Sequence, residues 1–433
     1  MLRIAHLLGI KKNEFSSFLF SALYFFFVLA AYYILRPIRD QAAVAGGVHN
    51  IPWLFTATLT AMLIANPIFA TLVSKFTRRY FIPISYRFFT LNIIAFFGLF
   101  LYFDASESIW IGRIFYVWTS VFNLFVVSIF WAFMADTFSS AEGKRLFGLI
   151  AVGGTIGGIT GSTITATLSE AFGPVYLLLI SAVLLELALH CFRRLADKKP
   201  EAGLPDSPEE DSIESGGNPQ KGNSRIPMGG RITAGISNVL KSGYLRGIAG
   251  YILLYTLLST YLYFQQAQLF ESHFSNVAER TAAFASVDLA VNALTLITQL
   301  FLTGKIIKRF GVGFSLALLP LVCVLGFLWM SFSPGIVALV LLQVFRRSSN
   351  YAVSRPARET LFTVLSRENK YKAKNFIDTF VYRLGDQVGA WSWAGLSALG
   401  LGISGISLVS VPLSATWMLL SLWLGRKMDE SKR

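Results

Sequence analysis

Residues 196–230 read ADKKPEAGLPDSPEEDSIESGGNPQKGNSRIPMGG, and they form the least apolar stretch of the chain. Proline, glycine, serine and charged residues dominate it, so it cannot bury enough apolar surface to offset the entropy lost on ordering. Long apolar runs of similar length and spacing lie on both sides. We therefore predict a flexible linker at 195–240 that joins two membrane-embedded halves, 1–194 and 241–433.

The composition on either side of this linker indicates a membrane protein. Of the 433 residues, 54% are hydrophobic and 14% are charged, whereas soluble proteins average about 25% charged residues. Twelve apolar runs approach the roughly 20 residues that a helix needs to cross the bilayer core. They lie at 15–36, 51–74, 82–103, 109–135, 147–169, 174–192, 245–270, 281–303, 313–332, 335–354, 375–399 and 403–425. The predicted fold class is an all-α membrane protein with twelve transmembrane helices in two six-helix bundles.

Lysine and arginine are concentrated in alternate connections between the runs, as at 75–79, 305–309 and 355–374. The positive-inside rule then places both termini and the linker in the cytoplasm of a multi-pass inner-membrane protein. The net charge of +14 is spread over these connections and not over one soluble face, so no nucleic-acid partner is expected. The only two cysteines, Cys191 and Cys323, lie in different runs, and we predict neither a disulfide nor a metal site.

Three charged residues end the first apolar run, in YYILRPIRD at 32–40. Arg36 and Asp40 are four residues apart, and Arg39 lies between them, so they share a helix face if the helix continues past Pro37. Pro37 can instead kink or end the helix. Two interpretations stay open: the three charges anchor the helix end at the interface, or they form an outer basic gate for an anion.

Glycines spaced by four residues mark KRLFGLIAVGGTIGGITGS at 144–162. The pairs Gly154–Gly158 and Gly157–Gly161 allow close approach of helix backbones. A phosphate-binding loop is the alternative, but no Gly-Lys-Ser/Thr follows the glycines. Asn123, in the fourth run, is expected near the membrane midplane.

Polar side chains recur every three or four residues in the seventh run, at Tyr255, Ser259, Tyr263 and Gln266. This spacing indicates either a hydrogen-bonding face between helices or the wall of a cavity, and we leave both open. Asp288 lies about a third of the way into the eighth run.

Charged residues are dense at 343–391, which covers the end of the tenth apolar run, the connection after it and the first part of the eleventh run. If a helix starts near Gly335, Arg346 lies about 16 Å along it, close to the midplane. A charge there costs at least about 2.5–3.5 kcal/mol unless it faces protein or water, and neither Arg346 nor Arg347 can reach the interface.

The eleventh run has charges at positions suited to ion pairs within a helix. Lys374 and Asp378 are four residues apart, and Arg383 and Asp386 are three apart. One interpretation is that these charges only neutralise one another across helices. The other, which we favour, is that they mark a substrate or ion path.

Two basic segments occupy equivalent places in the two halves: ATLVSKFTRRY at 70–80 and TGKIIKRFGVG at 303–313. The second resembles the short cytoplasmic loop between the second and third helices of each half in major facilitator transporters, and the first lacks its glycines. The resemblance implies a latch that joins the cytoplasmic ends of neighbouring helices by charge-assisted hydrogen bonds.

Three stretches, ILRPIRD (34–40), KRLFGLIAVGG (144–154) and SRPARETLFTVLSRENKYKAKNFIDTFVYRLGD (354–386), resemble the bacterial and plastid ATP/ADP (NTP/NDP) exchange transporter family. The resemblance spans most of the chain. It implies functional basic residues at the family's positions, which are matched here by Arg39, by Arg358 before Glu359, and by Lys372 and Lys374 before Ile377 and Asp378.

The chain departs from that family at several positions. The nucleotide exchangers carry functional carboxylates in the fourth and seventh helices, where residues 119–123 and 256–260 are uncharged here. The Lys-Ser of the family that follows Arg-Leu-Gly is replaced by Asp386 and Gln387. The chain therefore resembles a divergent branch, whose cargo the fold does not fix.

We predict a secondary transporter that moves an organic anion, either a nucleotide or another phosphorylated or polycarboxylate metabolite, by alternating access. Arginine offers a planar fork that suits phosphate and carboxylate. The candidate substrate-binding residues are Arg36, Arg39, Asn123, Tyr263, Arg346, Arg347 and Arg383, and the candidate coupling or gating residues are Asp40, Asp288, Arg358, Asp378 and Asp386. The expected partners are the anionic substrate, membrane lipid and, if a carboxylate titrates, protons; we expect a monomer.

Other functions fit the same fold. A lipid or lipid-linked precursor flippase would need an apolar lateral portal, and a proton-coupled carboxylate (chelate) importer would need a titrating carboxylate. A scaffold or sensor without transport would not need charges at the midplane. We expect no enzyme, cofactor or metal, because no nucleophile–base set or metal-ligand cluster is visible and the four histidines lie at the ends of runs or in loops.

Overall fold

A computed structural model describes residues 14–103, 105–198, 239–365, 373–374 and 376–430, and almost all of them are helical. In chain order the helical segments are α2 (Phe15–Ala45), η1 (Val48–Asn50), α3 (Ile51–Lys75), α4 (Arg78–Tyr102), α5 (Ala105–Thr137), α6 (Ser140–Phe172), α7 (Leu177–Lys198), α9 (Gly243–His273), α10 (Val277–Phe301), α11 (Thr303–Phe332), α12 (Ile336–Ser349), η2 (Asn350–Ser354), α13 (Arg355–Leu361), η3 (Phe362–Val364), η4 (Ile377–Val381), α15 (Tyr382–Ala398) and α16 (Ile403–Glu430). Every predicted apolar run coincides with one or two of these segments.

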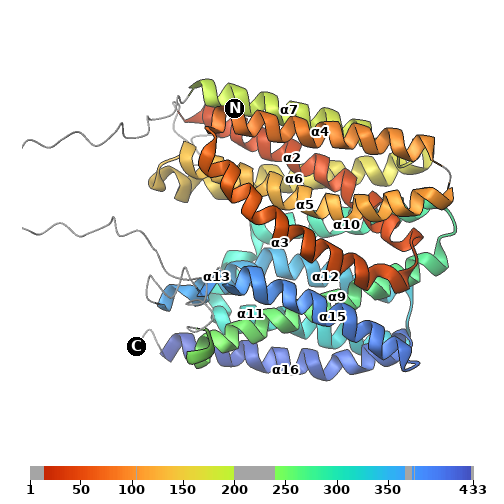
Figure 1. The fold of residues 1–433 in the computed structure, drawn as a ribbon. Helices are drawn as coiled ribbons and strands as arrows, with labels where there is room; N and C mark the ends of the chain where they lie inside the picture. Colours follow the sequence, from red (N-terminus) through yellow and green to blue (C-terminus); the bar gives the residue numbers. More distant parts are fainter. Residues whose placement is uncertain (1–13, 104, 199–238, 366–372, 375, 431–433) are drawn as a thin grey trace, which may run out of the picture.

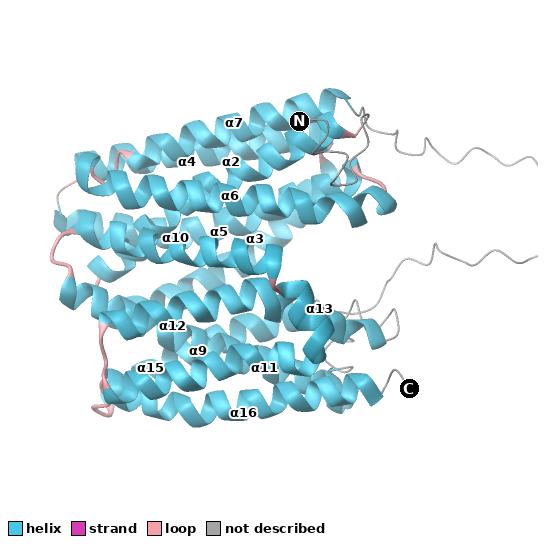
Figure 2. Cartoon of the chain, turned by 180° about the vertical axis from the view of Figure 1, so that it is seen from behind, coloured by secondary structure: helices cyan, strands magenta, loops and turns pink. Residues whose placement is uncertain are grey.

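Within these ranges, nine helices are long and apolar enough to cross a membrane. The three remaining predicted runs correspond to α7, to α12 with η2, and to η4 with α15, which lie alongside the nine (Figures 1 and 2). Helices suit this setting because each satisfies its backbone hydrogen bonds internally, where no water can do so. The all-α membrane fold is confirmed, and that all twelve segments cross the bilayer stays a prediction.

The helices lie roughly parallel, and the two chain termini are at the same end of the bundle (Figure 1). We call this end the terminal face and the opposite end the far face. Buried apolar side chains form two clusters, one drawn from residues 24–195 and one drawn mainly from residues 239–428. Helices α3 and α10 lie between them: α3 contacts α15, and α10 contacts α2 and α6. Most of the predicted linker lies outside the described residues, so the division into two halves stays a prediction.

The first apolar run is longer than predicted. Helix α2 continues through Pro37 to Ala45, although proline cannot donate to the helical ladder. Arg36, Arg39 and Asp40 therefore lie inside a continuous helix, about two turns before its end, and not at a helix terminus. This correction matters because it moves the three charges from the expected interface toward the middle of the bundle.

Two π-helical segments interrupt the later helices. Segment η2 follows Ser349, and η4 precedes Tyr382. A π-turn disturbs the regular backbone ladder and is frequent at functional sites. Side chains from neighbouring helices bond to carbonyls of η2: Thr303 Oγ1 donates to Ala352 O at 2.8 Å, and Gln299 Nε2 to Tyr351 O at 3.4 Å.

The second basic segment is helical, contrary to the loop that we expected at 303–313. Helix α11 starts at Thr303, and the break comes only at Gly311, whose φ of +74° suits glycine. The first segment does join neighbouring helices, because Arg78 at the start of α4 forms an ion pair with Asp136 near the end of α5.

The glycines of α6 set its distance from α2. A Cβ added at Gly153 would lie 2.7 Å from Ala22 O, and one at Gly157 or Gly161 would lie still closer to the carbonyls of Phe26 and Ala30. The predicted close approach of backbones is thus confirmed for Gly157 and Gly161, with Gly153 on the same face, whereas a Cβ at Gly154 or Gly158 would meet side chains instead. This packing holds α2, which carries three of the charged candidate residues, against the rest of the first half.

We expect Gly157→Ala to destabilise the protein, because its Cβ would clash with the backbone of α2, and overpacking costs about 1–3 kcal/mol. Gly148→Ala is the matched control: it lies in the same helix, nothing is within 4 Å of its added Cβ, and alanine favours a helix. Thermal unfolding of the purified protein in detergent measures both. Equal melting temperatures for the two variants would contradict the close packing.

Candidate functional site

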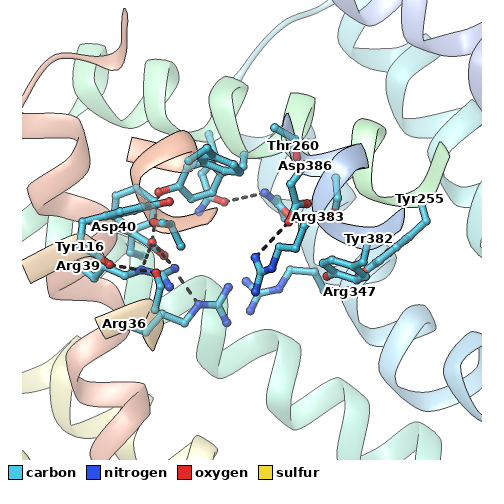
Figure 3. A pocket seen from close by; sticks show the side chains of 18 of the residues that line it. Arg36, Arg39, Asp40, Tyr116, Tyr255, Thr260, Arg347, Tyr382, Arg383 and Asp386 are labelled. Carbon is cyan, nitrogen blue, oxygen red and sulfur yellow. Dashed lines mark hydrogen bonds and ion pairs between the residues drawn. The ribbon is translucent and has the colours of Figure 1, made fainter. Parts of the chain in front are cut away.

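A polar cavity of about 240 Å³ lies between the two groups of helices. Five arginines and three aspartates line it: Arg36, Arg39, Arg346, Arg347, Arg383, Asp40, Asp288 and Asp386. Tyr263 also lines it, so the cavity contains every candidate substrate residue except Asn123. In Figure 3, Arg36 and Arg347 extend toward each other from opposite sides of the cavity.

Helix α2 supplies one wall. Arg39 Nη2 lies 2.6 Å from Asp40 Oδ1, and Arg36 Nε lies 3.8 Å from Asp40 Oδ2. Tyr263 Oη, from α9, donates to Asp40 Oδ1 at 3.3 Å, and the Arg39 guanidinium lies 5.2 Å from the centre of the Tyr116 ring. These side chains are mostly buried and bonded within the protein, which excludes interfacial anchoring as their role.

Asp288 of α10 connects the two groups of helices. Its Oδ1 lies 3.3 Å from Arg36 Nη1 on α2 and 2.6 Å from Arg347 Nη2 on α12. Only 4% of the Asp288 side chain is exposed. The Asp288 carboxylate thus balances two buried arginines, one on α2 and one on α12. For these three residues, the expectation that charges neutralise one another across helices holds.

Arg346 differs from the other arginines in its partners. Its Nη1 donates to Ser259 Oγ at 2.6 Å and its Nη2 donates to Gln343 Oε1 at 3.1 Å. Among the described residues, no carboxylate lies within 4.0 Å of it and its Nε has no hydrogen-bond acceptor. It follows Ile336 by ten residues, or about 15 Å of helix, as predicted from the sequence. Arg346 is therefore a buried cation held by neutral groups.

The polar stripe of the seventh run faces this cavity. Tyr255, Ser259, Tyr263 and Gln266 all line it, and Gln266 Oε1 accepts from Gln343 Nε2 at 2.7 Å. Both interpretations left open by the sequence hold, because these residues line the cavity and each also forms a hydrogen bond to a neighbouring helical segment.

On the far-face side, α3 and α15 close over the cavity. Thr56 Oγ1 donates to Gln387 Oε1 at 3.0 Å and accepts from Trp391 Nε1 at 3.3 Å. Trp53 packs edge-on against Trp391, with ring centroids 4.9 Å apart. Arg383 Nη1 lies 3.3 Å from Asp386 Oδ2, so this predicted in-helix pair is present.

On the terminal-face side, the cavity meets a second cavity of about 650 Å³, which we call the vestibule. The two cavities share six lining residues: Leu59, Tyr255, Tyr351, Tyr382, Arg383 and Gln387. The gating candidates Arg358 and Asp378 line the vestibule and form an ion pair at 3.9 Å. The predicted ion pair between Lys374 and Asp378 is wrong, because Lys374 pairs with Glu359 instead. Lys372 lies outside the described residues.

One residue that we predicted at the cavity lies elsewhere, and some residues that line the cavity were not predicted. Asn123 is half-buried and does not line the cavity, whereas Ser120 and Tyr116 of the same helix do. Helix phase explains the error, since midplane depth says nothing about which face a residue occupies. Gln343 could have been predicted to line the cavity, because it lies one helical turn before Arg346. The sequence around Tyr116 has no comparable feature.

Comparison with known proteins assigns this arrangement to a family. Residues 15–369 match the profile of the Major Facilitator Superfamily. The chain belongs to the Major Facilitator Superfamily. It is 21% identical over 498 residues to the ADP,ATP carrier protein 2 of Chlamydia pneumoniae, and the alignment covers 98% of this chain and 91% of that protein.

The fold is also similar to a crystal structure of a bacterial homologue of the human lysosomal transporter Spinster, in an inward-facing and unoccupied conformation. The TM-score is 0.58 at 13% identity, with 97% of this chain and 98% of the other covered. As a Major Facilitator Superfamily member, the chain is a multi-pass secondary transporter, and the resemblance to ATP/ADP-type members is confirmed as that of a divergent relative.

We expect Asp288→Asn to lower the melting temperature clearly, because Arg347 then has no carboxylate within 4 Å among the described residues and breaking a buried ion pair costs about 3–5 kcal/mol. Asp136→Asn is the matched control, since it breaks the exposed pair with Arg78, and such pairs contribute at most about 1 kcal/mol. Tryptophan fluorescence of each variant during heating measures the difference. If Asp288→Asn melts no lower than Asp136→Asn, the bridging role is wrong.

Proposed function

We propose that the protein carries an organic anion through the central cavity. The observation that carries this proposal is the charge of the lining, where five arginines face three aspartates. An uncompensated charge at this depth costs at least about 2.5–3.5 kcal/mol. A bound anion would supply the missing negative charge, and Arg346, which has only neutral partners, is its strongest anchor.

The chemistry of the lining suits a phosphorylated or polycarboxylate metabolite, and among these we propose a nucleotide. Guanidinium groups bind phosphate or carboxylate in a bidentate manner, and Tyr116, Tyr255 and Tyr263 provide rings on which a base can stack. The similarity to an ADP,ATP carrier supports a nucleotide. The uncharged stretches at 119–123 and 256–260 set this chain apart from the nucleotide exchangers. The central proposal is therefore an organic anion that carries phosphate or carboxylate groups.

The open and closed ends of the path fit alternating access. The cargo would enter through the vestibule at the terminal face while Thr56, Gln387 and Trp391 close the far face. The distribution of lysine and arginine favours a cytoplasmic terminal face in a bacterial inner membrane. Rocking of the halves 1–194 and 241–433 about the cavity, joined by the linker 195–240, would then expose the site to the other side.

The vestibule ion pairs are suited to gating. Arg358–Asp378 and Lys374–Glu359 connect the α13 region with the residues that lead into α15. Pairs that lie along the entry path can open for an anion and re-form after it passes. Arg358 would also offer a cation to a cargo in the vestibule.

A lipid flippase is less well supported. The central cavity is lined by charged and polar groups, whereas a large apolar cavity of about 850 Å³ lies outside it and shares none of its lining residues. A lipid in that cavity would be separated from the central site by α3 and α5.

Neutralising Arg346 tests the proposal. A thermal-shift screen with ADP, glucose 6-phosphate and citrate, one for each candidate class, identifies the anion that stabilises the protein most, and this compound is then radiolabelled for uptake into proteoliposomes. We expect Arg346→Ala to reduce uptake at least tenfold at normal expression, and Arg346→Lys to retain part of it, because lysine keeps the charge but not the fork. Arg246→Ala, at an exposed position on α9 that lines neither the cavity nor the vestibule, is the control. Near-normal uptake by Arg346→Ala would remove the cavity from the transport path.

The same vesicles separate exchange from proton symport. Each lining aspartate has an arginine within 3.3 Å, so a proton bound by any of them would break an ion pair, and this favours exchange. Uptake should then require unlabelled cargo inside the vesicle and persist without a pH gradient. Dependence on the gradient alone would indicate the proton-coupled importer.

A further inference from the structure

The apolar cavity of about 850 Å³ is a groove on the membrane side of α3, α4 and α5. Its walls are almost entirely aliphatic and aromatic: Trp53, Leu54, Ala57, Ala61, Phe88, Phe89, Trp110, Ile114, Val117, Trp118, Val121 and Phe125. Two polar residues, Asn50 and Arg113, also line it, and both lie near the far face, where α3 begins and α5 is in its early turns. The groove is therefore polar at its far-face end and apolar over the rest of its length.

Arg113 has more hydrogen-bonding capacity than the protein uses. Its Nη2 donates to Gly46 O at 3.2 Å, and its guanidinium lies 4.5 Å from the centre of the Trp110 ring. Its buried Nε has no acceptor, and none of the described side chains places a carboxylate within 4.0 Å of it. A guanidinium has five N–H donors, so capping the end of α2 at Gly46 accounts for only one of them.

The dimensions and the aromatic side chains fit one leaflet of a bilayer. Trp53 and Trp110 are 63% and 66% exposed, and exposed tryptophans are typical of the membrane–water interface. From Arg113 to Phe125 the groove follows α5 for about 18 Å. This length is close to the roughly 15 Å depth of one leaflet of a 30 Å hydrocarbon core.

We propose that this groove binds one anionic phospholipid of the far-face leaflet. Its phosphate accepts hydrogen bonds from Arg113, and an acyl chain lies against Phe88, Trp118 and Phe125. The positive charge of Arg113, which is balanced by none of the described side chains, selects a headgroup with net negative charge. This site is separate from the central cavity and does not depend on the identity of the cargo.

Native mass spectrometry of the delipidated full-length protein tests the proposal. The protein is titrated with phosphatidylglycerol and with phosphatidylcholine of the same acyl chains. We expect phosphatidylglycerol to bind at an at least fivefold lower concentration, Arg113→Gln to abolish this preference, and Arg113→Lys to retain part of it. Arg309→Gln, which removes an exposed arginine outside the groove, should behave as the wild type.

A second variant tests the contribution of the apolar groove independently of the charge of Arg113. Ala57→Trp fills the groove from an exposed position on α3, and it should weaken binding of both lipids at least fivefold without unfolding the protein. Full retention of phosphatidylglycerol preference in Arg113→Gln, equal binding of the two lipids by the wild type, or unchanged binding by Ala57→Trp would each overturn the proposal.

Discussion

A charge in the middle of a membrane protein is stable only where it faces water or protein groups that compensate for lost hydration. In this chain the Asp288 carboxylate compensates two arginines at once. It forms ion pairs with Arg36 of α2 and with Arg347 of α12, which belong to different halves of the sequence. The arrangement of the cavity depends on this carboxylate, because without it two buried guanidinium groups would face each other across the interface. Arg346, the residue before Arg347 in α12, has no such carboxylate among the described residues, and this contrast separates a structural charge from one available to a cargo.

The packing of the helices explains how the charges reach the same place. The glycines of α6 bring α2 close enough for its backbone carbonyls to contact those glycines, and the continuation of α2 past Pro37 carries Arg36, Arg39 and Asp40 inward. Helices α3 and α10 lie between the two clusters of buried apolar side chains, where α3 contacts α15 and α10 contacts α2 and α6. The contacts of α3 with α15 close the far face, while the vestibule opens toward the terminal face.

Much of this could be predicted from the sequence, for identifiable reasons. Apolar run length is a local property, and the twelve predicted runs coincide with helices. The distance of Arg346 along its helix was predicted because it follows from helix rise alone, and its position at the midplane stays a prediction. Asn123 was wrongly expected at the site because its depth does not determine which face it occupies. The Lys374–Asp378 pair was wrong because spacing along a helix cannot account for Glu359, which comes from a distant segment. The aromatic groove with Arg113 was missed altogether, since it is assembled from α3, α4 and α5.

The most direct test of the central claim is to locate a bound anion. Tungstate mimics phosphate and has strong anomalous scattering, so crystals of the wild-type protein soaked in it would show where a tetrahedral anion binds. We predict an anomalous peak in the central cavity within hydrogen-bonding distance of the Arg346 guanidinium, and its loss in Arg346→Ala crystals. Peaks confined to the basic residues of the terminal face, with no density near Arg346, would contradict the account.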